Sequence, residues 1–285
     1  MTTRLKLAVL GTPIAHSRSP QLQTSFAQDC GVADFSYERI ETDRETLLAT
    51  VRRLVSEGYD GFNCTMPLKT DMALLADELG HEARDLCSAN TMAVKDGRLY
   101  ADTTDGGGIL LTVRRGYGDA SASPADCVRG KKVALLGAGG AARSAALSLK
   151  NAGAELTILN RTLSSAEALR TMLQTPCECL ALTEENTVAA AKSCDILINC
   201  TAAGMAGQPE FASLAFIDAL PSHAMVIDAV YNPLETTLLK KAAARGLTAM
   251  SGLWMLVYQG ALAFEKWSGV LPDEDACARA FDLIK

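Results

Sequence analysis

The sequence predicts an α/β fold made of two domains, and three observations support this prediction. Short apolar runs alternate with amphipathic stretches along nearly all of the 285 residues, as parallel strands alternate with helices. The chain is longer than a usual single-core domain. Hydrophobic residues make up 48% of the sequence and charged residues 21%, which is enough for a buried core in each half. We therefore expect two domains, with a cleft for a small ligand between them.

Each half has its own series of apolar runs, and the intervals between these runs are expected to be helical. The predicted strands of the first half are Lys6–Leu10, Phe35–Ile40, Gly61–Asn63, Thr91–Lys95 and Arg98–Ala101. Those of the second half are Lys132–Leu136, Leu156–Asn160, Cys179–Leu182, Ile196–Asn199, Met225–Ala229 and Leu247–Met250. This repeat of strand and helix is typical of a doubly wound sheet. The apolar segment Leu253–Trp267 has helical spacing and is predicted to pack back onto the first domain.

Charge, hydropathy and cysteine usage argue against a nucleic-acid-binding, membrane, secreted or metal-binding protein. The net charge of −6 provides no basic face for a nucleic acid, and no apolar run reaches the roughly 20 residues that cross a bilayer. The first residues lead into a short strand and lack the longer apolar region of a signal peptide. The nine cysteines are scattered without a CxxC pair, so we expect reduced thiols and no metal. These features predict a cytoplasmic protein without a membrane or nucleic-acid partner.

A glycine-rich turn in the second half has the context of a dinucleotide-binding motif. The run Gly137-Ala138-Gly139-Gly140-Ala141-Ala142 follows the strand Lys132–Leu136 directly and precedes a helical stretch. In this G-x-G-x-x-A pattern, Gly137 permits the tight turn, Gly139 lets the backbone approach a pyrophosphate, and Ala142 lets the helix lie close to the strand. The positive end of the helix favours phosphate groups. A glycine turn alone is weak support, because a purely structural turn has the same composition.

The end of the next strand supports the cofactor interpretation and selects between two cofactors. The strand Leu156–Asn160 runs into Asn160-Arg161-Thr162, about 20 positions after the first glycine, where an NAD site usually has an acidic residue. A carboxylate there would repel a 2′-phosphate, whereas Arg161 can form charge-assisted hydrogen bonds to it. The sequence therefore predicts NADP.

Polar groups of the first half occur where predicted strands end. Ser17 and Ser19 can both face one anionic group, although a serine-proline cap of the following helix explains the pair equally well. Lys69 and Asp105 each follow a predicted strand, and Asn90 directly precedes one, so all three lie near strand ends. Because a doubly wound sheet gathers its ligands at the carboxyl ends of strands, we expect these groups to converge, with Lys69 as the candidate for the chemistry.

As a set, these residues resemble the shikimate dehydrogenase family over nearly the whole chain. The matching motifs, in chain order, are G-x-P-x-x-H-S-x-S-P, N-x-T-x-P-x-K, A-N-T, T-D-G-x-G, G-A-G-G-A, N-R-T, Asn199–Met205, Asp228–Pro233 and Gly252–Gln259. The resemblance implies an enzyme that interconverts shikimate and 3-dehydroshikimate with NADP(H), in the biosynthesis of chorismate and the aromatic amino acids. It also implies a mostly parallel α/β substrate domain, 1–104 completed by the helices of 252–285, and a Rossmann-type NADP-binding domain, 105–251.

The resemblance further implies roles for individual positions. Those expected to bind the carboxylate or ring hydroxyls of the substrate are Ser17, Ser19, Thr65, Asn90, Tyr231 and Gln259. Those expected to line the cofactor are Gly137, Ala138, Gly139, Gly140, Ala141, Asn160, Arg161, Thr162, Thr201, Ala229 and Gly252. Lys69 and Asp105 are expected to flank the reacting hydroxyl as the catalytic pair. Burial would lower the pKa of Lys69 and Asp105 would raise it, so the sequence leaves the protonation state of Lys69 open.

Two other functions are compatible with the sequence. The helix that contains Trp254, Tyr258 and Gln259-Gly260-Ala261 resembles relatives that also oxidise quinate, whereas the presence of both Ser17 and Ser19 favours shikimate. A ligand-sensing module without turnover, built on the same fold, is the second alternative, and the presence of both Lys69 and Asp105 argues against it. The sequence is compatible with a monomer or a homodimer.

Overall fold

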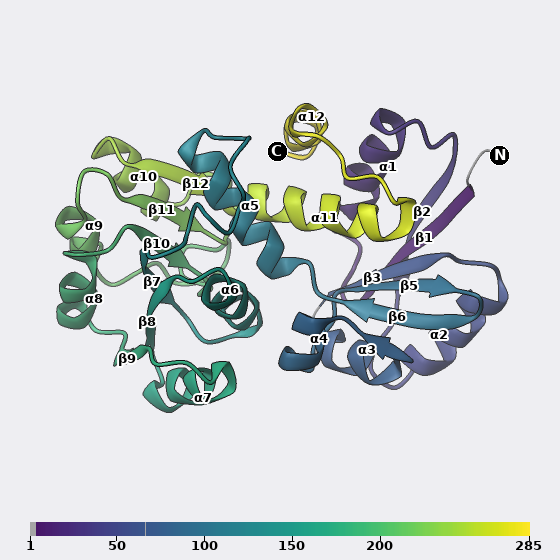
Figure 1. Ribbon diagram of the computed structural model, residues 1–285, viewed down its shortest axis with the longest axis horizontal. Coiled ribbons are helices and arrows are strands. Elements are labelled where there is room, and N and C mark those ends of the chain that lie inside the picture. Colours follow the sequence, from purple (N-terminus) through teal and green to yellow (C-terminus); the bar gives the residue numbers. More distant parts are fainter. Residues whose placement is uncertain (1–3, 66) are drawn as a thin grey trace. The chain divides into compact units, whose positions relative to one another are not determined.

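The computed structural model describes residues 4–65 and 67–285, which fold as two compact α/β units (Figure 1). The first unit ends at Asp105 and is completed by Val257–Lys285, while the second unit is Gly106–Leu256. The turn-rich stretch 116–124 lies inside the second unit, although its composition alone resembles a linker between domains. In the described part of the chain, no helix is both long enough and apolar enough to cross a membrane.

The first unit contains a mixed sheet whose strands lie in the order β2-β1-β3-β5-β6-β4. The strands are β1 (Arg4–Gly11), β2 (Asp34–Glu41), β3 (Gly61–Cys64), β4 (Glu78–Leu79), β5 (Thr91–Lys95) and β6 (Arg98–Asp102). Strand β5 runs antiparallel to both of its neighbours, and the other pairs are parallel. The predicted strands of this half are all present. Sequence analysis missed β4 because two residues are too short to show an alternating pattern.

Helices cover both faces of this sheet. They are α1 (Ser19–Asp29), α2 (Leu47–Ser56), α3 (Lys69–Leu75), α4 (His81–Leu86), the C-terminal part of α11 (Gly252–Ser268) and α12 (Glu274–Ile284). On one face, α2, α3 and α4 contribute to a core that includes Phe62 and Met92 of the strands. On the other, Phe264 of α11 packs against Phe26 of α1 and Phe35 of β2. The final helices are therefore part of the core of the first unit.

The second unit is a parallel, doubly wound sheet in the order β12-β11-β10-β7-β8-β9 (Figure 1). Its strands are β7 (Lys132–Leu136), β8 (Glu155–Asn160), β9 (Glu178–Ala181), β10 (Ile196–Asn199), β11 (Met225–Asp228) and β12 (Thr248–Ser251). Its helices are α5 (Asp105–Tyr117), which begins at the last residue of the first unit, α6 (Gly140–Asn151), α7 (Leu163–Leu173), α8 (Glu184–Ala191), α9 (Ala215–Ala219) and α10 (Thr237–Ala244). This order is that of the Rossmann fold, so the predicted fold class is confirmed. The carboxyl ends of β7, β8 and β10 meet at one edge of the sheet.

Candidate active site

Lys69 and Asp105 form an ion pair in the first unit. Lys69 is the first residue of α3 and Asp105 is the first residue of α5, so each follows closely on a strand of the sheet. The Lys69 Nζ lies 2.5 Å from Asp105 Oδ2, and the two side chains are only 26% and 10% exposed. The pair is therefore largely withdrawn from water, where charges interact more strongly than at an open surface.

The ion pair decides the protonation state of Lys69. Burial by itself lowers the pKa of this amine, but the charge of Asp105 and the hydrogen bond to it raise the pKa by more. The resulting pKa lies above the ordinary value of 10.5. Lys69 is therefore an ammonium ion at neutral pH.

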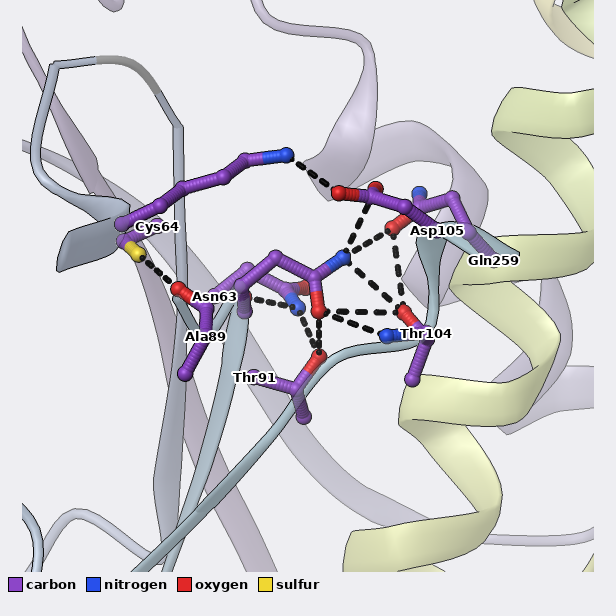
Figure 2. A network of polar contacts seen from close by, with 9 residues as sticks. Asn63, Cys64, Ala89, Thr91, Thr104, Asp105 and Gln259 are labelled. Carbon is purple, nitrogen blue, oxygen red and sulfur yellow. Dashed lines mark hydrogen bonds and ion pairs between the residues drawn. The ribbon is translucent and has the colours of Figure 1, made fainter. Parts of the chain in front are cut away.

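A network centred on the Asn90 amide fixes the position of Asp105. The Asn90 Nδ2 lies 3.1 Å from Asp105 Oδ1, 2.9 Å from Thr104 Oγ1 and 3.1 Å from Gln259 Oε1. Asn90 Oδ1 accepts hydrogen bonds from the backbone N–H of Thr104 at 2.9 Å and from the Thr91 hydroxyl at 3.0 Å. Figure 2 shows Thr104, Asp105 and Gln259 gathered at this point, with Thr91 below them. The network thus joins a loop before β5, the start of α5 and helix α11.

Polar groups on β2, β3 and β5 support Asn90 through further hydrogen bonds. The Asn63 Nδ2 donates to the Asn90 carbonyl at 3.1 Å and to Thr91 Oγ1 at 3.0 Å (Figure 2). Asn63 Oδ1 in turn accepts from the Tyr37 hydroxyl at 2.7 Å. Next to Asn63, burial raises the pKa of the Cys64 thiol to about 12, so this cysteine is a neutral thiol. These groups hold the site but do not supply a nucleophile.

The two serines lie at the start of α1, in the same unit as the ion pair. The Ser17 hydroxyl donates to Ser19 Oγ at 3.2 Å, and the Ser19 backbone N–H lies 3.3 Å from Ser17 Oγ. The N-cap residue Arg18 forms no side-chain cap bond, but Ser17 Oγ accepts from the backbone N–H of Ser19, the first residue of α1. Ser17 thus satisfies one N–H at the start of α1, which fits the helix-cap interpretation, and the binding of an anion by the serine pair stays a prediction.

Thr65 is held beside the first strand. Its backbone N–H donates to the Leu10 carbonyl at 3.1 Å, and its own carbonyl accepts from Leu68 at 2.9 Å. A side chain at Gly11 would collide with the Thr65 methyl group, so this close approach requires glycine.

The predicted substrate residues are divided between the two units. Five of them belong to the first unit: Ser17, Ser19, Thr65, Asn90 and Gln259. The sixth, Tyr231, belongs to the second unit and is 41% exposed.

The second unit has a cavity of about 620 Å³ at the carboxyl edge of its sheet. The predicted cofactor residues that line it are Gly137, Ala138, Gly139, Asn160, Arg161 and Thr201. The predicted residues outside its lining are Gly140, Ala141, Thr162, Ala229 and Gly252. Its volume lies within the range of roughly 300–1,000 Å³ that is usual for small-molecule sites.

The backbone of this cavity suits a pyrophosphate. Gly137 has a φ of +111°, which strains any other residue, and a side chain there would press on the Cys200 carbonyl. A side chain at Gly139 would meet no protein atom within 4 Å, so the space beside it is open. Helix α6 begins here without a side-chain cap, which leaves its first N–H groups for an anion. These features fit the pyrophosphate of NADP, and Arg161, which directly follows β8, lines the same cavity.

A buried carboxylate organises the loop that contains Thr201, and sequence analysis did not identify it. Asp228 is fully buried at the end of β11. Its Oδ1 accepts from Asn199 Nδ2 at 2.9 Å and from the Val230 N–H at 3.0 Å, while its Oδ2 accepts from the Thr236 hydroxyl at 2.6 Å. Asn199 Oδ1 then accepts from the backbone N–H and the hydroxyl of Thr201 at 2.9 and 2.7 Å. Asp228 therefore positions Thr201 through Asn199.

We expect Asp228→Asn to change how stability depends on pH. Burial raises the pKa of the Asp228 carboxyl above its ordinary 3.8, and hydrogen bonds from Thr236, Val230 and Asn199 offset only part of this effect. The folded state therefore loses stability through Asp228 as pH rises from the unfolded pKa to the folded one. In urea unfolding at a series of pH values, the free energy of unfolding of the parent should fall relative to that of Asp228→Asn as pH rises through this window. Above the window, the difference between the two proteins should stay constant. A difference that is independent of pH would contradict this assignment.

Sequence reasoning also missed Thr104, Asn63 and Tyr37 as parts of the network around Asn90. Thr104 and Asn63 are the first residues of two recognised motifs, T-D-G and N-x-T-x-P-x-K, so these motifs could have identified both residues as part of the site. Tyr37 lies within an ordinary strand pattern, and its role depends on a contact with a residue 26 positions away. No local pattern could have identified Tyr37.

Three family models match parts of the chain. They are described as the shikimate dehydrogenase substrate binding domain, over residues 9–92, shikimate / quinate 5-dehydrogenase, over 120–208, and the shikimate 5′-dehydrogenase C-terminal domain, over 252–280. A curated relative, shikimate dehydrogenase (NADP(+)) of Roseobacter denitrificans, is 37% identical over 98% of each chain.

Two solved structures extend the comparison to the fold. Shikimate 5-dehydrogenase of Thermus thermophilus, in complex with NADP(H) and shikimate, has a TM-score of 0.82 and 32% identity over 99% of this chain and all of its own. The ligand-free 5-ketofructose reductase of a Gluconobacter strain has a TM-score of 0.83 and 29% identity over the full length of both chains. The same fold thus occurs in proteins named for different substrates.

Proposed function

This chain belongs to the shikimate dehydrogenase family, and from that membership we propose how its residues carry out NADP-dependent oxidation of shikimate and reduction of 3-dehydroshikimate. The single observation that supports the proposed mechanism is the 2.5 Å ion pair between Lys69 and Asp105, inside a network of hydrogen bonds. A secondary alcohol can lose a hydride only if its hydroxyl proton also leaves, so the site needs a group that exchanges a proton with that oxygen.

Lys69 is the proton-transfer group. In the reduction of the ketone, its ammonium ion donates a proton to the oxygen as negative charge develops there. The raised pKa of Lys69 favours this direction at neutral pH, because the proton is already in place. In the oxidation of the alcohol, Lys69 must first lose its proton, so we expect that direction to accelerate as pH rises. The family resemblance implies that this reduction is the biosynthetic direction, towards shikimate and chorismate.

Asp105 orients Lys69 and the substrate hydroxyl. One of its oxygens accepts from Lys69 and the other accepts from Asn90 at 3.1 Å, so both the position and the direction of the carboxylate are fixed. Asn90 and Gln259 present further amide groups for the ring hydroxyls. The substrate carboxylate is bound by three hydroxyls, those of Ser17, Ser19 and Thr65. The family resemblance also assigns Tyr231 to the substrate.

NADP(H), when bound, supplies the hydride acceptor or donor. Gly137, Ala138, Gly139 and the start of α6 would hold its pyrophosphate, and Asn160, Arg161 and Thr162 would hold the 2′-phosphate. Thr201 would contact the same cofactor, in a loop held by Asn199 and Asp228. The nine cysteines form no disulfide within the part of the chain that the structure describes, as expected of a cytoplasmic enzyme in a reducing compartment.

The proposal is tested by absorbance at the NADPH band, with shikimate or quinate and with NADP or NAD, in all four combinations. We expect the highest kcat/KM for shikimate with NADP. A comparable value for quinate would favour the broader quinate/shikimate dehydrogenase, which the family name over residues 120–208 also includes. No absorbance change in any combination would leave a non-catalytic binding module as the remaining function.

A further inference from the structure

Arg39 makes a paired contact with the loop that contains both substrate serines. It lies on β2, and its Nε and Nη2 both donate to the Ser17 carbonyl, at 3.0 and 2.5 Å. Along an extended strand, residues two apart share a face, so Arg39 continues the row formed by Phe35 and Tyr37. Phe35 packs on Phe264 and the Tyr37 hydroxyl donates to Asn63 at 2.7 Å, so this row joins the serine loop to the core of the first unit.

The charge of Arg39 is not neutralised within the protein. In residues 4–65 and 67–285, no carboxylate forms an ion pair with its guanidinium, whereas Arg44 pairs with Asp71 and Arg53 pairs with Glu57 in the same unit. The neighbouring Arg18 is engaged differently, because its guanidinium donates to the Ile284 carbonyl at the end of α12. Arg39 is exposed, and it brings to the Ser17 backbone a positive charge that no ion pair with a described carboxylate neutralises.

We propose that Arg39 is a positioning residue that selects anionic substrates, by holding Ser17 and placing a positive charge next to the serine pair. This inference rests on the proposed function, in which Ser17 and Ser19 bind the substrate carboxylate. The serines by themselves are neutral donors, which could hydrogen-bond a hydroxyl as well as a carboxylate. A nearby guanidinium favours the carboxylate, because its charge interacts with an anion and hardly with a neutral group.

The test compares Arg39→Met and Arg39→Lys with the parent enzyme, on shikimate and on its neutral methyl ester. For Arg39→Met we expect KM for shikimate to rise roughly 10-fold, the size of a charge-assisted hydrogen bond, while kcat and the KM for NADP stay within about twofold. The rise in KM for the methyl ester should be several times smaller. Arg39→Lys should recover part of the affinity for shikimate, because it restores the charge but not the paired donors.

Arg53→Met is the matched control, since it removes an arginine from the same unit at an exposed i,i+4 ion pair with Glu57. It should leave both KM values unchanged. Equal losses on shikimate and on its methyl ester in Arg39→Met would overturn the proposal and leave Arg39 as a brace of the loop only. Unchanged KM values would overturn it as well. If the parent enzyme itself fails to oxidise shikimate, the proposed function fails first, so the two failures are distinguishable.

Discussion

Replacing Lys69 with alanine is expected to lower kcat for shikimate oxidation by roughly 10²- to 10⁴-fold, the usual contribution of a positioned general acid or base. The KM for shikimate should change far less, because we assign the carboxylate and ring hydroxyls of the substrate to other residues. The loss should appear in both reaction directions, since the same group accepts the proton in one and donates it in the other. Steady-state kinetics in both directions, with NADP or NADPH, measure this effect.

Two further variants separate proton transfer from charge at the same position. Lys69→Arg retains a positive charge that can pair with Asp105 but cannot release its proton near neutral pH, so its kcat should remain low. Lys69→Met removes the charge with a similar volume, and its thermal unfolding shows whether loss of activity reflects loss of the fold. A near-normal kcat in Lys69→Ala would rule out the proposed role. So would a near-normal kcat in Lys69→Arg.

The pH dependence of the parent enzyme provides a related measurement. Because the pKa of Lys69 is raised above 10.5 by Asp105, the amine stays protonated through neutral pH. The kcat for shikimate oxidation should therefore keep rising into the alkaline range, and Asp105→Asn should move this rise to lower pH by removing the negative charge. This comparison belongs with the Lys69 variants, since it reports on the same proton.

Replacing Arg161 with alanine is expected to raise the KM for NADP by roughly 10- to 100-fold, as loss of a charged, bidentate contact to a phosphate does. The KM for NAD should stay nearly constant, because NAD lacks the 2′-phosphate. Arg161→Asp should go further and reverse the preference, since a carboxylate repels the phosphate and can accept from the ribose 2′-hydroxyl of NAD. The ratio of kcat/KM for NADP to that for NAD is the measurement.

Arg129→Ala is a matched control for Arg161, since it removes an exposed arginine from the second unit, where it pairs only with the nearby Asp126. This variant should keep the cofactor preference of the parent. If Arg161→Ala weakens NADP and NAD equally, the contact is not to the 2′-phosphate, and the specificity must come from other residues of the cavity. The fold should be unaffected, because Arg161 lies on the surface.

The direction of the strands in each sheet is predicted unequally well by the sequence pattern. The apolar run of β5 gives no indication that the strand is antiparallel to its neighbours, because side-chain alternation is the same in both directions. The direction follows from how closely β5 and β6 succeed one another, through the turn at Asp96-Gly97. By contrast, the second unit repeats strand and helix so regularly that its parallel sheet was predictable.

The sequence by itself determined the type of fold and the glycine turn at Gly137 and Gly139, and it predicted NADP as the cofactor from Arg161. These features depend on residues close together in the chain, where spacing alone fixes geometry and charge. Only the tertiary structure decided that Lys69 and Asp105, 36 positions apart, form one ion pair, and that Asn90 joins Gln259 across 169 positions. It also decided the protonation state of Lys69, because burial and the charge of Asp105 oppose each other and their balance depends on a distance of 2.5 Å. The contact between Arg39 and Ser17 was likewise decided only by the tertiary structure, since it joins two segments whose sequence patterns are unrelated.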